Sequence, residues 1–244
     1  MSSCRQFASL CLLLFLLSVS QSLTVKATGA PSDVTPSSIL PDGKNGAPLV
    51  EQLVGNVNSL GNYKFDGSQE AQTGNKVLKA VGTFYFRPAN SMRVEVKSFG
   101  GKSGSILVKN ADGAIKGKGG AQMLGMKMSL GPDSRLLRMP NGLSAVECDL
   151  ASLLKRLKQE AASGCKMVSG NEPMNVESLG TRAIVLESQK ADNSGTSVVD
   201  RVFIDPVKKL PVQWDLFVNG KFQSRSKFQN YQTNIQIDES QFNL

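Results

Sequence analysis

Histidine is absent from the 244 residues of this chain. Its absence excludes Ser-His-Asp and Cys-His nucleophilic systems, and it removes imidazole as a metal ligand. Carboxylate pairs could still act as acid and base, and the chain has 20 acidic residues. Four of them lie on or beside expected strands, and we interpret these as solvent-exposed side chains rather than catalytic ones: Glu187, Asp200, Asp205 and Asp215.

A phosphate-binding loop is also missing. The segment Phe99–Ser103 has the glycines, lysine and serine of such a loop. However, the first glycine that the motif requires would fall at Val96, and a strand follows where a helix should begin. The sequence therefore predicts no catalytic residue, no metal site and no cofactor, and we expect that the protein is not an enzyme.

Cysteines are few, and only Cys148 and Cys165 lie beyond the N-terminal region. Two thiols in an exported chain normally suggest a disulfide. These two flank a helix expected at Leu150–Ala161, which would be about 18 Å long. Bridged Cα atoms lie within roughly 7 Å of each other. We therefore favour two free thiols, although a bridge stays open if both flanks fold back along the helix.

Long apolar runs are lacking except at the N-terminus, where one extends from Phe7 to Val19 after the basic residue Arg5. It falls short of the ~20 residues of a membrane-spanning helix, and small residues follow it. This pattern predicts a secretory signal peptide over residues 1–27, cleaved somewhere between 20 and 27. A membrane anchor is the alternative, and lipidation is disfavoured because Cys11 lies inside the apolar run. We expect a periplasmic protein, with secretion as the alternative.

Residues 28–47 are rich in Pro, Gly and Ser and poor in apolar side chains, which predicts a disordered tether. The remaining residues, 48–244, fit one domain. The net charge of the whole chain is +8, and this suits anionic headgroups or a membrane surface. Nucleic acid is disfavoured as a partner because the basic residues are spread along an exported chain.

Hydrophobic periodicity predicts two amphipathic helices, Leu49–Leu60 and Leu150–Ala161, and many short strands between turn residues. Asn219-Gly220 is a strong hairpin signal. With hairpin-length connections and no regular alternation of strand and helix, the pattern favours an antiparallel α+β domain. The expected strands are Tyr63–Glu70, Lys76–Phe86, Met92–Ser98, Ser105–Val108, Gly113–Lys118, Met123–Leu130, Lys166–Ser169, Met174–Ser178, Ala183–Ser188, Val198–Ile204, Val212–Val218 and Phe222–Tyr231.

The stretch Gly82–Val96 combines an aromatic strand, an Arg87-Pro88 corner and a returning strand that opens with Met92-Arg93. It resembles the LolA-like family of periplasmic carriers, and weaker matches continue in order to Asn234–Asp238. The resemblance implies a strongly curved antiparallel β half-barrel with helices covering its concave face. It also implies a hydrophobic cavity for acyl chains, with Arg87 at the rim as a candidate for cargo release.

The resemblance also implies a function. We expect a monomeric exported binding protein or chaperone that carries a lipid or the acyl chains of a lipoprotein, received from and delivered to membrane-associated donor and acceptor proteins. The alternative is a sensory or protein-interaction module of an envelope-stress or assembly system. Seven apolar residues are candidates for lining the cavity, although core packing is the simpler explanation for them: Phe84, Phe86, Met92, Leu124, Met126, Met128 and Trp214.

Overall fold

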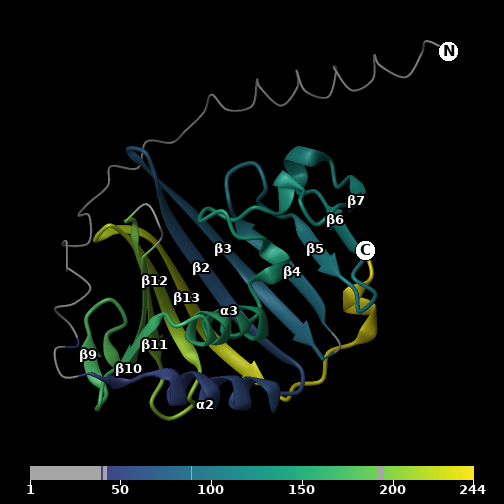
Figure 1. Ribbon diagram of the computed structural model, residues 1–244. Helices are drawn as coiled ribbons and strands as arrows, with labels where there is room; N and C mark the ends of the chain where they lie inside the picture. The colour runs from purple at the N-terminus through teal and green to yellow at the C-terminus, as the bar shows by residue number, and fades with distance from the viewer. Residues whose placement is uncertain (1–39, 41–42, 89, 192–194) are drawn as a thin grey trace. The chain divides into compact units, whose positions relative to one another are not determined.

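One antiparallel sheet of thirteen strands dominates the computed structural model, which describes residues 40, 43–88, 90–191 and 195–244 (Figure 1). The strand order is β1-β8-β10-β11-β12-β13-β2-β3-β4-β5-β6-β7, with β9 paired to β10. The path has two ends, so the sheet is open. The bounds are β1 Lys44–Asn45, β2 Tyr63–Thr73, β3 Lys76–Arg87, β4 Ser91–Ser98, β5 Ile106–Lys109, β6 Ile115–Lys118, β7 Lys127–Leu130, β8 Lys166–Ser169, β9 Met174–Val176, β10 Thr181–Ala191, β11 Ser197–Ile204, β12 Pro211–Val218 and β13 Lys221–Thr233.

Two α-helices, α2 (Ala47–Asn58) and α3 (Leu150–Ala162), lie across the same face of the sheet (Figure 1). The described residues also form four single-turn 3-10 helices, three in connections and the last after β13: η2 Ala121–Met123, η3 Arg135–Leu137, η4 Ala145–Glu147 and η5 Glu239–Phe242. The predicted α+β fold class, a curved antiparallel half-barrel with helices on one face, is confirmed. Within the described residues, no helix is both long and apolar enough to cross a bilayer.

Local sequence explains both ends of α3. The Asp149 side chain accepts a hydrogen bond from the backbone N–H of Ser152 at 2.9 Å, which satisfies one of the free donors of the first turn. Gly164, with φ +83°, follows the last turn, as is common at helix C-termini. Between them Leu150, Leu154 and Leu157 are buried on one face, so burial of this face against α2 and the sheet stabilises the helix.

A pair of glycines shapes the helix-facing side of the sheet. Gly67 on β2 is directly opposite Gly82 on β3. A Cβ at Gly67 would lie 2.6 Å from Cε2 of Phe84, so the missing side chain makes room for that ring. Phe84 then stacks on Phe65 with ring centroids 5.0 Å apart. The main hydrophobic core forms here, between these aromatic side chains and the two helices.

The opposite face of the sheet carries a row of alternating charges, because neighbouring residues in a strand point to opposite faces. We call it the charge row. Arg201 Nε lies 2.7 Å from Glu187 Oε1, and Arg225 Nη2 lies 2.8 Å from Asp215 Oδ2. In register across six strands the row consists of Glu187, Arg201, Asp215, Arg225, Glu70 and Lys79.

The interpretation of the strand carboxylates as solvent-exposed is wrong for three of the four residues. Glu187 and Asp215 are each 1% exposed, and Asp200, on the helix-facing side, is 2% exposed. A buried carboxylate is tolerated where an opposite charge is one strand away. Asp205 has a different role, since it accepts hydrogen bonds from the backbone N–H groups of Val207 and Lys208 in a hairpin turn.

The structure differs from two other expectations. Lys44–Asn45, inside the segment expected to be a disordered tether, pairs with β8, so ordered structure begins before residue 48. The strand expected at Met123–Leu130 begins only at Lys127, because Leu124 and Gly125 have φ angles of +51° and +66°, which extended strands do not adopt. The predicted signal peptide lies outside the described residues.

Candidate functional site

A pocket lies on the helix-facing side of the sheet, where aromatic side chains of the strands meet α3 and the segment 131–149 that precedes it. Its cavity measures about 90 Å³, well below the ~300–1,000 Å³ of typical small-molecule pockets. Little of the pocket is therefore enclosed. We call it the sheet pocket.

The sheet pocket is mainly apolar, with a polar side formed by β13 and by residues 131–149, which we call the covering segment. Gln69 links the two, because its Nε2 donates to Ser226 Oγ at 3.1 Å and its Oε1 accepts from the backbone N–H of Asn141 at 3.3 Å. The lining residues are Phe65, Gly67, Ser68, Gln69, Phe84, Met139, Asn141, Leu143, Cys148, Leu153, Arg156, Asp200, Trp214, Leu216, Ser224, Ser226, Lys227 and Phe228.

Three polar side chains meet at one wall of the sheet pocket. Asp200 Oδ1 accepts from Trp214 Nε1 at 2.6 Å and lies 2.9 Å from Arg156 Nη2. The Arg156 guanidinium also lies over the Trp214 ring, 4.9 Å from its centroid. Arg156 Nε is buried and has no hydrogen-bond partner in the described part of the chain. This wall therefore places a cation, paired with Asp200, against the Trp214 ring, and it contains one buried guanidinium N–H that has no hydrogen-bond partner among the described residues.

Burial raises the pKa of Asp200 above its usual value near 3.8, and nearby Glu160 raises it further, while Arg156, the Trp214 N–H and Lys190 oppose the shift. The carboxylate is thus less favoured in the folded protein than in the unfolded chain. The protonated Asp200 side chain therefore stabilises the fold. This contribution is complete below pH 3.8, the pKa of the group in the unfolded chain, and is lost as the pH rises through the raised pKa of the folded protein.

The substitution Asp200→Asn tests this sign. Asparagine does not titrate, so the stability of the wild type relative to the variant should increase as the pH falls from neutral towards about 4. Urea unfolding of both proteins over this pH range measures the difference. A relative loss of wild-type stability on acidification would instead show that attraction to Arg156 outweighs burial.

Of the seven predicted cavity residues, the structure brings Phe84 and Trp214 together in the sheet pocket. Phe86 and Met92 belong to the adjoining core, where Phe86 stacks on Tyr63 with centroids 4.8 Å apart. Both side chains point into the core because neighbouring residues of β3 and β4 alternate between the two faces of the sheet, as the period of two in the sequence suggested. A core residue can also line the pocket, as Phe84 does.

The three remaining residues lie elsewhere. Met128 borders a second, smaller pocket beside Lys102, whose Nζ donates to the backbone carbonyls of Leu136 and Arg138 in the covering segment. Leu124 and Met126 are exposed, by 94% and 61% respectively. The positive φ angles that end the expected strand turn these two side chains away from the sheet.

Arg87 lies at the β3–β4 corner but does not line the sheet pocket. It pairs with Glu239 at 3.4 Å, and its guanidinium lies 4.9 Å from the centroid of the Phe242 ring. Both partners belong to the C-terminal segment that packs beside β4. A role for Arg87 in cargo release stays a prediction.

Sequence reasoning missed Arg156, which lies on the polar face of an amphipathic helix and looks like a solvated residue. Only the position of α3 over Trp214 gives it a role. Cys148 and Cys165 are both free, as favoured. Burial raises the pKa of the Cys148 thiol to about 12, and the thiol donates to the Ser144 carbonyl at 3.2 Å, so it is an inert core group.

No family model and no curated protein matches the chain. Similar solved structures include a LolA superfamily protein from Nitrosomonas europaea, at 8% identity and a TM-score of 0.37 over 81% of this chain and 97% of that one. The lipoprotein LppX from Mycobacterium tuberculosis matches at 10% identity and a TM-score of 0.45, over 79% and 97%. MucB in the Pseudomonas aeruginosa MucA/MucB complex matches at 13% and 0.41, over 82% of this chain but 61% of that one.

At these identities the likeness concerns the fold alone. The fold class predicted from the sequence is the one observed: in the described part of the chain, an open, curved antiparallel sheet has two helices across one face.

Proposed function

We propose that the protein is a non-catalytic binding protein that holds an acyl chain of a lipid or lipoprotein in the sheet pocket and carries it across an envelope compartment. The pocket itself supports this proposal, since it joins an aromatic floor to a polar wall at Arg156. Export, a periplasmic location and delivery between membrane-associated partners belong to the same proposal. Export and a periplasmic location rest on the N-terminal sequence, and delivery between membrane-associated partners rests on the resemblance to the LolA-like family.

The energetics suit reversible binding. Each buried methylene contributes ~0.8 kcal/mol, so eight of them contribute about 6 kcal/mol before the cost of association. A water molecule needs roughly 10–15 Å³ of cavity volume, so the 90 Å³ of the sheet pocket holds only a few waters. A longer chain therefore requires the covering segment 131–149 to move away from the sheet. The contacts of Gln69 with Asn141 and of Lys102 with the segment's carbonyls would open in that movement.

The small enclosed volume favours the second candidate function, a sensory or protein-interaction module. In that case occupancy of the sheet pocket would change the position of segment 131–149 and so alter a surface that a partner protein recognises. The two functions share the acyl-binding step and differ in whether the cargo is released to an acceptor.

Trp214 provides a direct test, because it is the single tryptophan of the chain and lines the sheet pocket. Dibromostearate should quench its fluorescence saturably, since bromine quenches only at short range, while unbrominated stearate should not. The substitution Leu216→Gln places an amide on the half-buried pocket wall and should weaken binding about tenfold or more, the effect of roughly two lost methylenes.

Val218→Gln is the matched control, since Val218 is half-buried on the same strand but does not line the sheet pocket. It should leave the titration unchanged, and thermal melts should confirm that both variants fold. If no acyl probe quenches wild-type Trp214 saturably, the carrier proposal is wrong, and so is any module whose partner surface responds to acyl binding in the sheet pocket.

A further inference from the structure

Two large apolar side chains stand out from the surface next to the sheet edge. Leu124 and Met126 lie in the turn between η2 and β7. The turn is well ordered by hydrogen bonds from Leu124 N to Ala121 O at 3.1 Å, and from Met126 N to Met123 O at 3.0 Å. Leu124 is thus held outward in a left-handed conformation that a residue with a Cβ disfavours. These two exposed side chains add little apolar burial to the fold, which points to a binding role.

Exposed lysines surround this turn. Lys118 on β6 is directly opposite Lys127 on β7, and both are exposed, as is Lys116 two residues away. Like charges opposite each other destabilise a sheet. Lysine on edge strands also discourages pairing with other sheets, but that explanation does not cover Leu124 and Met126. An anionic partner would relieve the repulsion and bury the apolar side chains.

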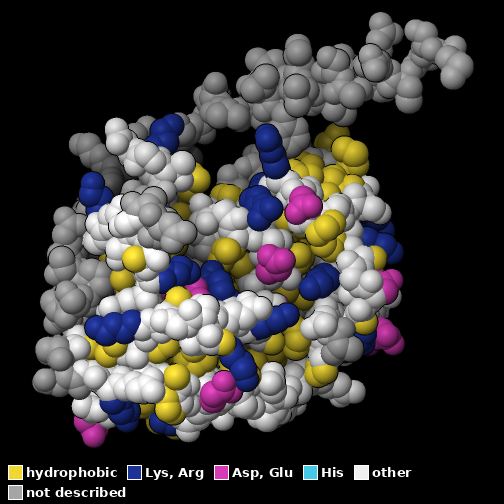
Figure 2. All heavy atoms as spheres, viewed as in Figure 1, with side chains coloured by type: hydrophobic (Ala, Val, Ile, Leu, Met, Phe, Trp, Pro, Cys, Tyr) yellow, Lys and Arg dark blue, Asp and Glu magenta, His cyan; other side chains and the backbone are white. Residues whose placement is uncertain are grey.

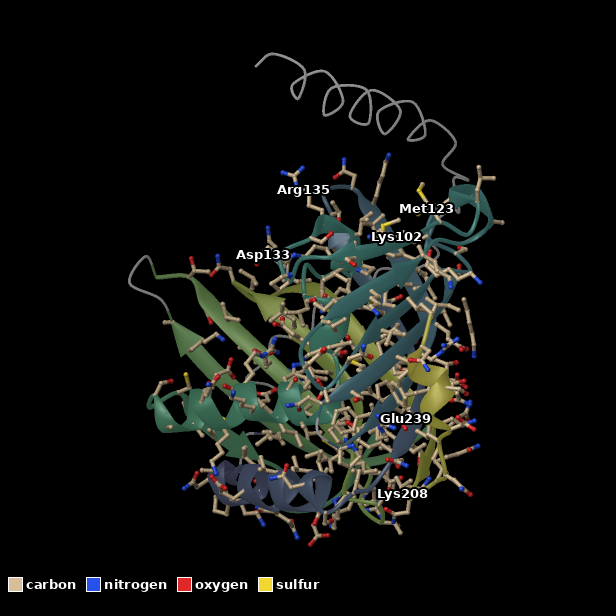
Figure 3. All side chains as sticks on the ribbon, turned by 90° about the vertical axis from the view of Figure 1, so that its right-hand side faces the viewer. Lys102, Met123, Asp133, Arg135, Lys208 and Glu239 are labelled. Atoms are coloured by element: carbon tan, nitrogen blue, oxygen red, sulfur yellow. The ribbon has the colours of Figure 1, made fainter. Side chains whose placement is uncertain are left out.

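The surrounding sequence concentrates the charge of the whole protein. Residues 97–138 contain eight Lys and Arg and only two acidic residues, a surplus of six out of the chain's net +8. Figure 2 shows hydrophobic side chains beside Lys and Arg over the β6–β7 end of the sheet. In Figure 3, Met123, Lys102 and Arg135 lie at one end of the domain and Lys208 lies at the other. The basic and apolar features therefore belong to one end.

We propose that this surface, formed by Leu124, Met126, Lys116, Lys118 and Lys127, docks on an anionic lipid bilayer. We call it the basic loop surface. Its apolar side chains enter the interface between headgroups and acyl chains, while the lysines contact the anionic headgroups. The inference does not depend on the sheet pocket, because a protein without an acyl ligand could dock in the same way.

Flotation with vesicles tests the proposal, using phosphatidylcholine vesicles with and without phosphatidylglycerol. The full chain should bind better to vesicles that contain phosphatidylglycerol, and added salt should weaken this preference. Lys118→Gln and Lys127→Gln should each lower the affinity about fivefold, the effect of one lysine near an anionic surface. Leu124→Gly should also weaken binding, yet keep or raise the thermal midpoint, because glycine accepts the left-handed conformation.

Val207 and Lys208 provide a matched control at the opposite end of the domain. Val207 is 86% exposed and is likewise followed by lysines, so Val207→Ser and Lys208→Gln should leave vesicle binding unchanged. All variants are made in the same full chain, so any contribution of the apolar run Phe7–Val19 is common to them.

The proposal is overturned if phosphatidylglycerol does not increase wild-type binding, or if the control variants weaken it as much as the loop variants do. It is also overturned if Leu124→Gly dissociates a dimer in sedimentation experiments, because the basic loop surface would then be a contact between two copies. Loss of acyl binding in the Trp214 titration with intact vesicle docking would leave this inference standing and remove only the carrier proposal.

Discussion

The substitution Arg201→Met is expected to lower the free energy of unfolding by about 3–5 kcal/mol, the cost of removing one partner of a buried ion pair. Glu187, which is 1% exposed, would lose the guanidinium that lies 2.7 Å from its Oε1. The Gln189 amide at 3.1 Å would be the remaining side-chain donor described for it. Urea unfolding at neutral pH measures the loss.

The double variant Glu187→Leu/Arg201→Met is the control. Replacing a buried pair by apolar side chains of similar volume is often neutral, because no uncompensated charge remains. We therefore expect the double variant to be more stable than Arg201→Met alone. If the double variant is no more stable than Arg201→Met alone, the Glu187–Arg201 pair does not act as a unit and the charge row has no cooperative role.

The second large effect is expected at Trp214. Trp214→Ala should lower the free energy of unfolding by about 3–5 kcal/mol, because it leaves a cavity in the core and removes the hydrogen bond to Asp200. Trp214→Phe keeps most of the apolar contact but loses the N–H donor. It should lower the free energy of unfolding by about 1–3 kcal/mol, because Arg156 is then the one described hydrogen-bond donor to Asp200.

Denaturant titrations followed by far-UV circular dichroism give both values for Trp214. The order of the two variants is the critical result. If Trp214→Phe is as damaging as Trp214→Ala, the hydrogen bond to Asp200 matters more than packing, and the polar wall of the sheet pocket is chiefly structural. If both variants are nearly as stable as the wild type, neither the packing of Trp214 nor its hydrogen bond to Asp200 contributes to stability.

Most of the fold could be predicted because local patterns determine it. Both described helices and eleven of the described strands occur where periodicity and turn residues placed them, and β7 covers only the second half of the strand expected at Met123–Leu130. Asn219 and Gly220, with φ angles of +50° and +74°, form the hairpin turn that their residue types favour. Leu124 is the exception, because a turn that begins with a leucine in the left-handed region has no sequence signal.

The candidate site could be predicted only in part. Phe84 and Trp214 were found because buried strands present aromatic residues inward, a property of each strand by itself. Arg156 and Asp200 were not, because their roles depend on how α3 crosses β11 and β12. Nothing near Arg156 in the sequence indicates that an indole ring lies 4.9 Å away.

The order of helices and strands, the hairpin at Asn219-Gly220 and the apolar faces could be predicted because each follows from the spacing of side chains within one segment. The pairing of buried charges could not, because it depends on tertiary structure. A two-residue hairpin alone would place Asp215 opposite Ser224, but a register shift next to Leu216 places it opposite Arg225. Such a bulge depends on how both strands fit the curved sheet, so the partners of buried charges are set by packing between distant segments.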